Sequence, residues 1–185
     1  MPLDWIEDFS RNWEKEYAEV DVSALPPLVR LARIGVLIEE FQHDVLEPFE
    51  LTPGDYGVLA ALRRAGKPYA LNPSQLYSRL RKSSGGMTKI LKRLEEAELV
   101  ERRPDPEDGR GTLVYLTRRG LALQDRVFSA FLTATNSLLS PLSDRQKTDA
   151  DRVLKDLLEL FELRGERRGD RRGLHNGIQR GGISR

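Results

Sequence analysis

The chain has 185 residues, contains no cysteine and carries 30 Lys/Arg against 29 Asp/Glu. The absence of thiols excludes disulfides, thiolate metal sites and cysteine-based redox sensing, and no apolar run approaches the ~18 residues that a membrane-spanning helix needs. A hydrophobic fraction of 39% is enough for a folded core, and acidic residues at positions 4, 7 and 8, in place of the basic flank of a secretory signal, favour a cytoplasmic protein.

The small net charge hides a segregation of charge along the chain. Residues 1–62 contain 4 Lys/Arg and 13 Asp/Glu, residues 63–119 contain 14 and 7, residues 120–163 contain 5 and 7, and residues 164–185 contain 7 and 2. The basic excess of residues 63–119 is what a surface that neutralises phosphate groups would need.

The first fifty residues predict two helices. Residues 1–22 read as an amphipathic extension, whose aromatic and apolar side chains recur among acidic residues. It could lie over the dimer helices or over a ligand cavity, and we expect its aromatic residues to pack rather than to form a cofactor site. Residues 23–50 repeat apolar side chains at spacings of three and four, which predicts a long helix. The two apolar sets are Trp5, Ile6, Phe9, Trp13 and Tyr17, then Leu28, Leu31, Ile34, Ile38, Phe41 and Val45.

Two capping signals mark the next helices. The segment TPGD at 52–55 is a capping box with Pro at the first helical position, and it opens a helix that ends near Gly66. The segment NPSQ at 72–75 has an Asn cap, a Pro at the first helical position and a Gln that can bond back to the cap. This second helix is expected to stop at residues 81–83, where Ser83 or Ser84 caps another helix.

That third helix has two distinct faces. Met87, Ile90, Leu91 and Leu94 follow the i, i+3, i+4, i+7 spacing of a core-facing stripe. The opposite side carries small, hydroxyl and charged residues, and such a face fits a DNA major groove about 12 Å wide. An ordinary solvated face is the alternative interpretation of the same pattern. The residues on this side are Gly85, Thr88, Lys89, Lys92 and Glu96.

A β-hairpin is predicted to follow. Residues 99–103 and 112–116 are short β-prone runs, and residues 104–111 between them are rich in turn formers. Arg110 near the tip could enter a narrow minor groove, with Asp108 holding its guanidinium by a charge-assisted hydrogen bond. A solvated turn with an incidental ion pair is the alternative.

The rest of the chain predicts two more helices and a tail. Thr117 caps a long helix, and SDRQ at 143–146 opens the last one, whose broad apolar stripe favours packing between subunits over closure of a monomer core. Residues 164–185 are rich in Arg and Gly, which predicts a disordered basic tail that either adds non-specific DNA affinity or is inert. The stripe consists of Ala150, Val153, Leu154, Leu157, Leu158 and Phe161.

Residues 28–163 resemble the MarR-type transcriptional regulators, named for multiple antibiotic resistance. The most specific matches are SSGGMT at 83–88, RLE at 93–95, DPEDGRG at 105–111 and LTRRG at 116–120. The resemblance implies a homodimer, a recognition helix in the major groove, a wing arginine held by an aspartate, and a small aromatic or amphipathic effector between the dimer helices and the DNA-binding unit. By resemblance the two wing roles fall on Arg110 and Asp108.

These observations give a mainly α fold with a small β-wing: a winged helix-turn-helix at 51–116, with long dimerisation helices at 23–50 and 117–163. We expect a dimeric, sequence-specific DNA-binding regulator, most simply a repressor of a pseudo-palindromic operator. Residues of the helix that begins at Ser83 or Ser84 are expected to face the major groove, and basic residues outside that helix are expected to contact phosphate. The groove-facing candidates are Ser84, Thr88, Lys89 and Lys92, and the phosphate candidates are Arg81, Lys82 and Arg103. Ser83 and Gly85 are also expected among the DNA-binding residues.

Other classes of function stay open. The basic face could contact an acidic protein partner instead of DNA, as in a winged-helix interaction module. An enzyme would need a site that the sequence does not reveal, because His43 and His175 have no spaced partner for zinc or for nucleophilic catalysis. Gly85-Gly86 lies outside any phosphate-loop motif. We therefore expect no metal, no cofactor and no catalytic residues.

Overall fold

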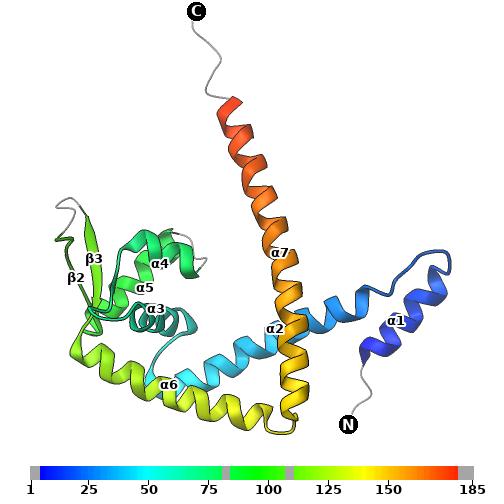
Figure 1. Cartoon of the computed structure of the whole chain (residues 1–185), viewed down its shortest axis with the longest axis horizontal. Coiled ribbons are helices and arrows are strands. Elements are labelled where there is room, and N and C mark those ends of the chain that lie inside the picture. The colour runs from blue at the N-terminus through cyan, green and yellow to red at the C-terminus, as the bar shows by residue number, and fades with distance from the viewer. Residues whose placement is uncertain (1–4, 81–83, 107–110, 179–185) are drawn as a thin grey trace, which may run out of the picture. The chain divides into compact units, whose positions relative to one another are not determined.

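The computed structural model describes residues 5–80, 84–106 and 111–178; the side chains of residue 84 and of residues 165–178 are outside this description. The chain forms two compact units, residues 1–134 and 135–185, and it is mainly helical with one small sheet, as predicted (Figure 1). None of the described helices is long and apolar enough to cross a membrane. In chain order the elements are α1 (Trp5–Glu16), α2 (Leu25–Leu46), η1 (Glu47–Phe49), α3 (Pro53–Arg64), β1 (Ala70–Leu71), α4 (Pro73–Leu80), α5 (Ser84–Glu96), β2 (Val100–Pro104), β3 (Thr112–Leu116), α6 (Arg118–Leu139) and α7 (Asp144–Ile178).

Both predicted capping boxes start helices of the first unit. At α3, the backbone N–H of Thr52 donates to Asp55 Oδ2 at 2.9 Å, and the N–H of Asp55 donates to Thr52 Oγ1 at 3.2 Å. At α4, the N–H of Asn72 donates to Gln75 Oε1 at 3.0 Å, and the N–H of Gln75 donates to Asn72 Oδ1 at 2.8 Å. Each box satisfies two backbone groups that a helix start leaves unpaired, which fixes where the helix begins.

The core of the first unit lies under α5. The four predicted core residues of this helix, Met87, Ile90, Leu91 and Leu94, are all buried. They pack in one cluster with α3 and α4 residues such as Leu59, Leu62 and Leu76, each with no exposed surface. Figure 1 shows α3, α4 and α5 grouped beside the β2–β3 ribbon. This cluster holds α5 by one face and leaves the other in solvent.

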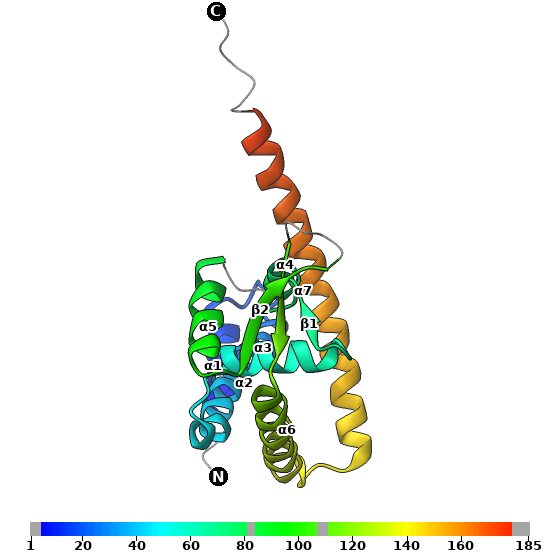
Figure 2. The same ribbon diagram turned by 90° about the vertical axis from the view of Figure 1, so that its left-hand side faces the viewer.

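The sheet has three antiparallel strands in the order β1-β3-β2 (Figure 2). The predicted hairpin forms β2 and β3, with Val100 opposite Leu116 and Pro104 opposite Thr112. The third strand, β1, is not predicted by the sequence: Ala70 pairs with Tyr115 and Leu71 with Val114. A strand of two residues is too short to show an alternating pattern.

The N-terminal helix α1 packs against α2, through Ile6 and Ser10, which are buried. Trp5, Trp13 and Tyr17 are exposed in the single chain, and the expectation that they pack in a dimer stays a prediction. Phe9 is half-buried, so the aromatic side of the helix is only partly covered.

One hydroxyl joins the wing to α6. Thr117 Oγ1 accepts the N–H of Gly120 at 2.9 Å, as a helix cap does, and donates to the carbonyl of Glu98 at 2.7 Å. The N–H of Thr117 also donates to the Leu99 carbonyl at 3.2 Å. Gly120 lies so close that an added Cβ would be 1.9 Å from the Leu99 oxygen. The start of α6 is thus fixed to the segment that leads into β2.

The second unit consists mainly of α7. The predicted start is confirmed, since the N–H and hydroxyl of Ser143 both donate to Gln146 Oε1, at 2.9 and 2.8 Å. The helix α7 continues through residues 164–178 to Ile178, and the disorder expected for residues 164–185 stays a prediction. That stretch has no proline and contains good helix formers such as Arg, Glu and Leu, so the preceding helix can propagate through its glycines.

Candidate nucleic-acid interface

The open face of α5 carries the residues that the sequence assigns to it. Gly85, Thr88, Lys89, Lys92 and Glu96 are all exposed. The Nζ of Lys92 lies 3.7 Å from a carboxylate oxygen of Glu96, one turn along the helix. An exposed pair of this kind contributes only a few tenths of a kcal/mol. The ammonium group of Lys92 can therefore leave Glu96 and bind a phosphate or a base edge instead.

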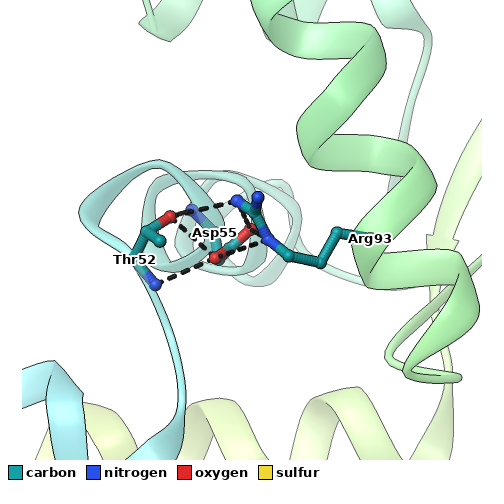
Figure 3. A network of polar contacts seen from close by, with 3 residues as sticks. All are labelled: Thr52, Asp55 and Arg93. Carbon is teal, nitrogen blue, oxygen red and sulfur yellow. Dashed lines mark hydrogen bonds and ion pairs between the residues drawn. The ribbon is translucent and has the colours of Figure 1, made fainter.

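A polar network fixes α5 to the start of α3 (Figure 3). The carboxylate of Asp55 accepts Arg93 Nε at 3.1 and 3.2 Å and Arg93 Nη2 at 2.6 Å. Thr52 Oγ1 donates to the same carboxylate at 2.7 Å and accepts a second bond from Arg93 Nη2 at 3.2 Å. Asp55 is 1% exposed, whereas the Arg93 side chain is half exposed. The buried carboxylate is thus fully compensated by charge-assisted bonds.

This network connects two roles that the sequence shows separately. Asp55 is recognisable as a capping residue of α3, and Arg93 as part of the RLE motif of α5. Nothing in the sequence indicates that these two side chains, 38 positions apart, bind each other. Because the two-pronged contact of a guanidinium with a carboxylate is directional, it sets the rotation of α5 about its axis as well as its distance from α3.

The wing is joined to α5 by a second ion pair. Arg102 Nε on β2 lies 3.1 Å from Glu95 Oε1. Arg103, predicted to contact phosphate, is exposed, is paired with Glu101 and lies over the Tyr115 ring with its guanidinium carbon 5.2 Å from the ring centroid. The N–H of Asp105 donates to the Gly111 carbonyl at 3.0 Å and closes the base of the loop. These contacts give the wing a defined direction relative to α5.

Several predicted site residues fall outside the described part of the chain. Arg81, Lys82, Ser83, Asp108 and Arg110 lie in residues 81–83 and 107–110. Ser84 begins α5, and its side chain is outside the description. The expected hydrogen bond between Asp108 and Arg110 therefore stays a prediction.

A cavity of about 570 Å³ lies among α2, α3 and α6. Its lining includes the rings of Tyr56 and Phe128, the cation of Arg64 and the buried amide of Gln124. Gln124 Oε1 has no hydrogen-bond partner among the described residues. Burial raises the pKa of Tyr56, although a hydrogen bond from Gln124 and the nearby charge of Arg64 oppose this shift. The cavity thus combines apolar walls with a few polar groups, as small-molecule sites do.

Arg63, near the end of α3, connects this helix to α6 and to Tyr69. Its Nε lies 3.0 Å from Asp125 Oδ1 on α6, and its Nη1 donates to the Tyr69 hydroxyl at 3.0 Å. The hydrogen bond to Asp125 is the main reason that the pKa of Arg63 is raised further above its already high ordinary value. Arg63 therefore acts as a permanent cation that ties α3 to α6.

Comparison with known proteins places this geometry in a family. The model of the MarR family matches residues 49–111. The transcriptional regulator PecS of Dickeya dadantii (strain 3937) is 33% identical over 143 residues, which are 77% of this chain and 86% of the relative. The multiple antibiotic resistance protein MarR of Escherichia coli (strain K12) is 36% identical over 98 residues, 52% of this chain and 66% of the relative.

A solved structure matches the fold as well as the sequence. The crystal structure of a MarR mutant from E. coli complexed with operator DNA has a TM-score of 0.64 and 27% identity, covering 75% of this chain and 99% of that chain. AbsC of Streptomyces coelicolor, another MarR-family regulator, has a TM-score of 0.69 at 24% identity, over 79% of this chain and 97% of that chain, which shows the likeness of fold. The chain belongs to the MarR family of transcriptional regulators.

Proposed function

We propose that this protein is a dimeric repressor that binds a pseudo-palindromic operator. The single observation that carries the proposal is the exposed cationic face of α5, held in a fixed orientation by the bonds between Asp55 and Arg93. A relative of the same fold was crystallised with operator DNA. Two copies related by a dyad would place their α5 helices in successive major grooves, about 34–36 Å apart.

Each side chain has a distinct role in this proposal. Thr88, Lys89 and Lys92 read base edges, and Gly85 lets the backbone of α5 approach them, with Ser83 and Ser84 at the start of the helix. Arg81, Lys82 and Arg103 contact phosphates, which sets register without reading sequence. Arg110, held by Asp108, enters the flanking minor groove.

The long helices would provide the dimer. We assign residues 51–116 to DNA binding, and residues 23–50 and 117–163 to dimerisation. Large apolar side chains are exposed in the single chain on all three helices, including Ile34 and Leu37 on α2, Leu132 on α6, and Leu154 and Phe161 on α7. Exposed apolar side chains of this size usually mark a contact surface, and a protein that binds a pseudo-palindromic operator needs a two-fold dimer. Both points support packing of two subunits through these helices.

We also propose a small aromatic or amphipathic effector that releases the DNA. The cavity beside Tyr56 and Gln124 supports it, because a buried carbonyl without a partner costs about 1–3 kcal/mol unless a donor satisfies it. A true effector would raise the melting temperature and weaken operator binding by linked amounts. A thermal-shift screen of phenolic and lipophilic metabolites, repeated with operator DNA present, tests this part.

The main test is selection of binding sequences from a random duplex pool, followed by fluorescence anisotropy at several salt concentrations. A preferred palindrome and a steep salt dependence are expected. Lys89→Ala should lower the slope of log affinity against log salt by about one unit if it contacts phosphate, or relax one position of the site if it contacts a base. Binding without sequence preference would instead support the interaction module.

A separate test concerns the wing. Arg110→Ala should weaken operator binding markedly and reduce the preference for A·T flanking sequence, since a narrow minor groove attracts arginine most strongly. Anisotropy titrations with A·T-flanked and G·C-flanked operators measure both effects. Unchanged affinity and unchanged flank preference would remove the wing from the proposed mechanism.

A further inference from the structure

An aromatic ladder covers one side of α1. We use this name for Trp5, Phe9, Trp13 and Tyr17, which recur every four residues and so share one face. Successive ring centroids are 6.0, 5.9 and 5.3 Å apart. Trp5 is 55% exposed, Trp13 38% and Tyr17 51%. The rings contact each other, but three of the four leave a large part of their surface in water.

The most deeply buried residues of α1 lie outside the aromatic ladder. The buried residues of α1 are Ile6 and Ser10, and the hydroxyl of Ser10 donates to the Ile6 carbonyl within the helix. A Trp or Tyr ring buries 150–250 Å² when it is covered. The exposed parts of these adjoining rings form an apolar patch that a partner could cover.

The charge around the aromatic ladder restricts what can cover it. Residues 1–22 contain seven Asp/Glu against two Lys/Arg. Glu7, Asp8, Glu14 and Glu16 of α1 are all exposed. Asp8 is already paired with Arg11 at 2.8 Å, which leaves Glu14 and Glu16, next to Trp13 and Tyr17 in the sequence, as acidic groups at this surface. A partner that combines apolar side chains with cations would therefore complement it. Arg is the best such cation, because its guanidinium also stacks on aromatic rings.

The C-terminal part of α7 has this composition. Leu160, Phe161 and Leu163 are 64%, 50% and 54% exposed. Residues 164–185 then contain seven Arg against two Asp/Glu. This segment complements the aromatic ladder in both respects, with an apolar stretch beside a basic one.

We infer that the aromatic ladder of α1 is a docking surface for the C-terminal part of α7, residues 160–178, from a second copy of the chain. The inference rests on the proposed dimer, since α1 packs on α2, and α2 itself exposes apolar residues such as Ile34 and Leu37. Each dimer would contain two such contacts. The acidic N-terminal extension would also keep the basic segment of the partner away from DNA phosphates.

The position of the tryptophans allows a direct test. Trp5 and Trp13 are the two tryptophans of the chain, so Trp fluorescence reports on α1 alone. The full chain is diluted through the dimer–monomer transition, which sedimentation equilibrium follows independently. We expect Trp emission to shift to longer wavelength, and acrylamide quenching to increase, in step with dissociation. Emission that does not change while the dimer dissociates would overturn the inference.

Charge reversal identifies the occupant. The triple variant Arg164→Glu, Arg167→Glu, Arg168→Glu should expose the tryptophans while sedimentation still shows a dimer. Arg145→Glu, at the other end of α7 and 93% exposed, is the matched control and should leave Trp emission unchanged. Tryptophans that stay equally protected in the triple variant would overturn the inference.

Reversing the charges on both surfaces distinguishes loss of docking from misfolding of a variant. Glu14→Lys with Glu16→Lys in α1 should also expose the tryptophans, and combining these two changes with the triple variant should restore protection, since the two charges are exchanged. Failure to restore protection in a folded dimer, checked by circular dichroism, would contradict the proposed partner. Sedimentation tests the proposed dimer: a full chain that is monomeric at every concentration would refute it. Trp quenching tests the docking of α7 on α1 in a chain that does form dimers.

Discussion

At the scale of single residues, Asp55 carries two functions with one carboxylate. It closes the capping box of α3 and binds Arg93 of α5. The first function is local, so the sequence TPGD predicts it. The second depends on where α5 packs, and the sequence contains no signal that pairs positions 55 and 93. The same limit applies to Thr117, which is predictable as a helix cap but not as a bond to Glu98.

Asp55→Ala should lower the free energy of unfolding by about 2–3 kcal/mol, because the change removes the capping-box partner of Thr52 and leaves the bonds of Arg93 unmade. Urea unfolding at neutral pH measures this. Asp125→Ala is the matched control, since both partners of its ion pair with Arg63 are exposed and the loss should be much smaller than for Asp55→Ala. Equal losses in the two variants would show that the buried network adds nothing.

Tyr56 should make stability depend on alkaline pH. Burial raises the pKa of Tyr56, so the folded protein disfavours its phenolate. The contribution of the protonated Tyr56 to the free energy of unfolding is fully present below the ordinary pKa of about 10. It is lost as the pH rises through the higher pKa that Tyr56 has in the folded protein. Tyr56→Phe should therefore lose less stability between pH 8 and pH 11 than the unchanged protein, measured by urea unfolding at both pH values. A parallel loss in the two proteins would contradict this role.

At the scale of elements, prediction succeeds where the signal is periodic or local. The buried stripe of α5 and the capping boxes at Thr52, Asn72 and Ser143 follow from spacing of a few residues. The strand β1 and the continuation of α7 are not predicted. The pairing of Ala70 with Tyr115 is long-range, and the composition of residues 164–178 fits either a solvated helix or a disordered tail.

Two glycines should respond in opposite ways to the same substitution. Gly120→Ala places a Cβ against the Leu99 carbonyl and should cost about 3 kcal/mol, because backbone must move. Gly85→Ala meets no atom within 4 Å and should raise stability by up to about 1 kcal/mol. Thermal unfolding measures both. If Gly85→Ala also keeps full operator affinity, α5 does not approach DNA closely at this residue.

At the scale of the whole molecule, the proposed dimer would cover apolar side chains that are exposed in the single chain. Leu154, Leu158 and Phe161 of α7 are each about half exposed in the single chain. Leu158→Asp should shift sedimentation equilibrium toward the monomer and weaken operator binding, while the first unit stays folded by circular dichroism. Lys155→Asp on the same helix is the control, since it replaces one exposed charged residue with another. Dimers of equal stability in both variants would exclude this stripe from the subunit interface.

The joint at Thr117 constrains how a signal can travel. One hydroxyl and one amide connect the turn after α5, the entry to β2 and the first turn of α6. With Gly120 pressed against the Leu99 carbonyl, the wing and α6 cannot tilt independently. If α6 changes its orientation, we therefore expect the β2–β3 hairpin to rotate with it. The span between the two hairpins of an assembled pair would then be adjusted at the far ends of the α6 helices.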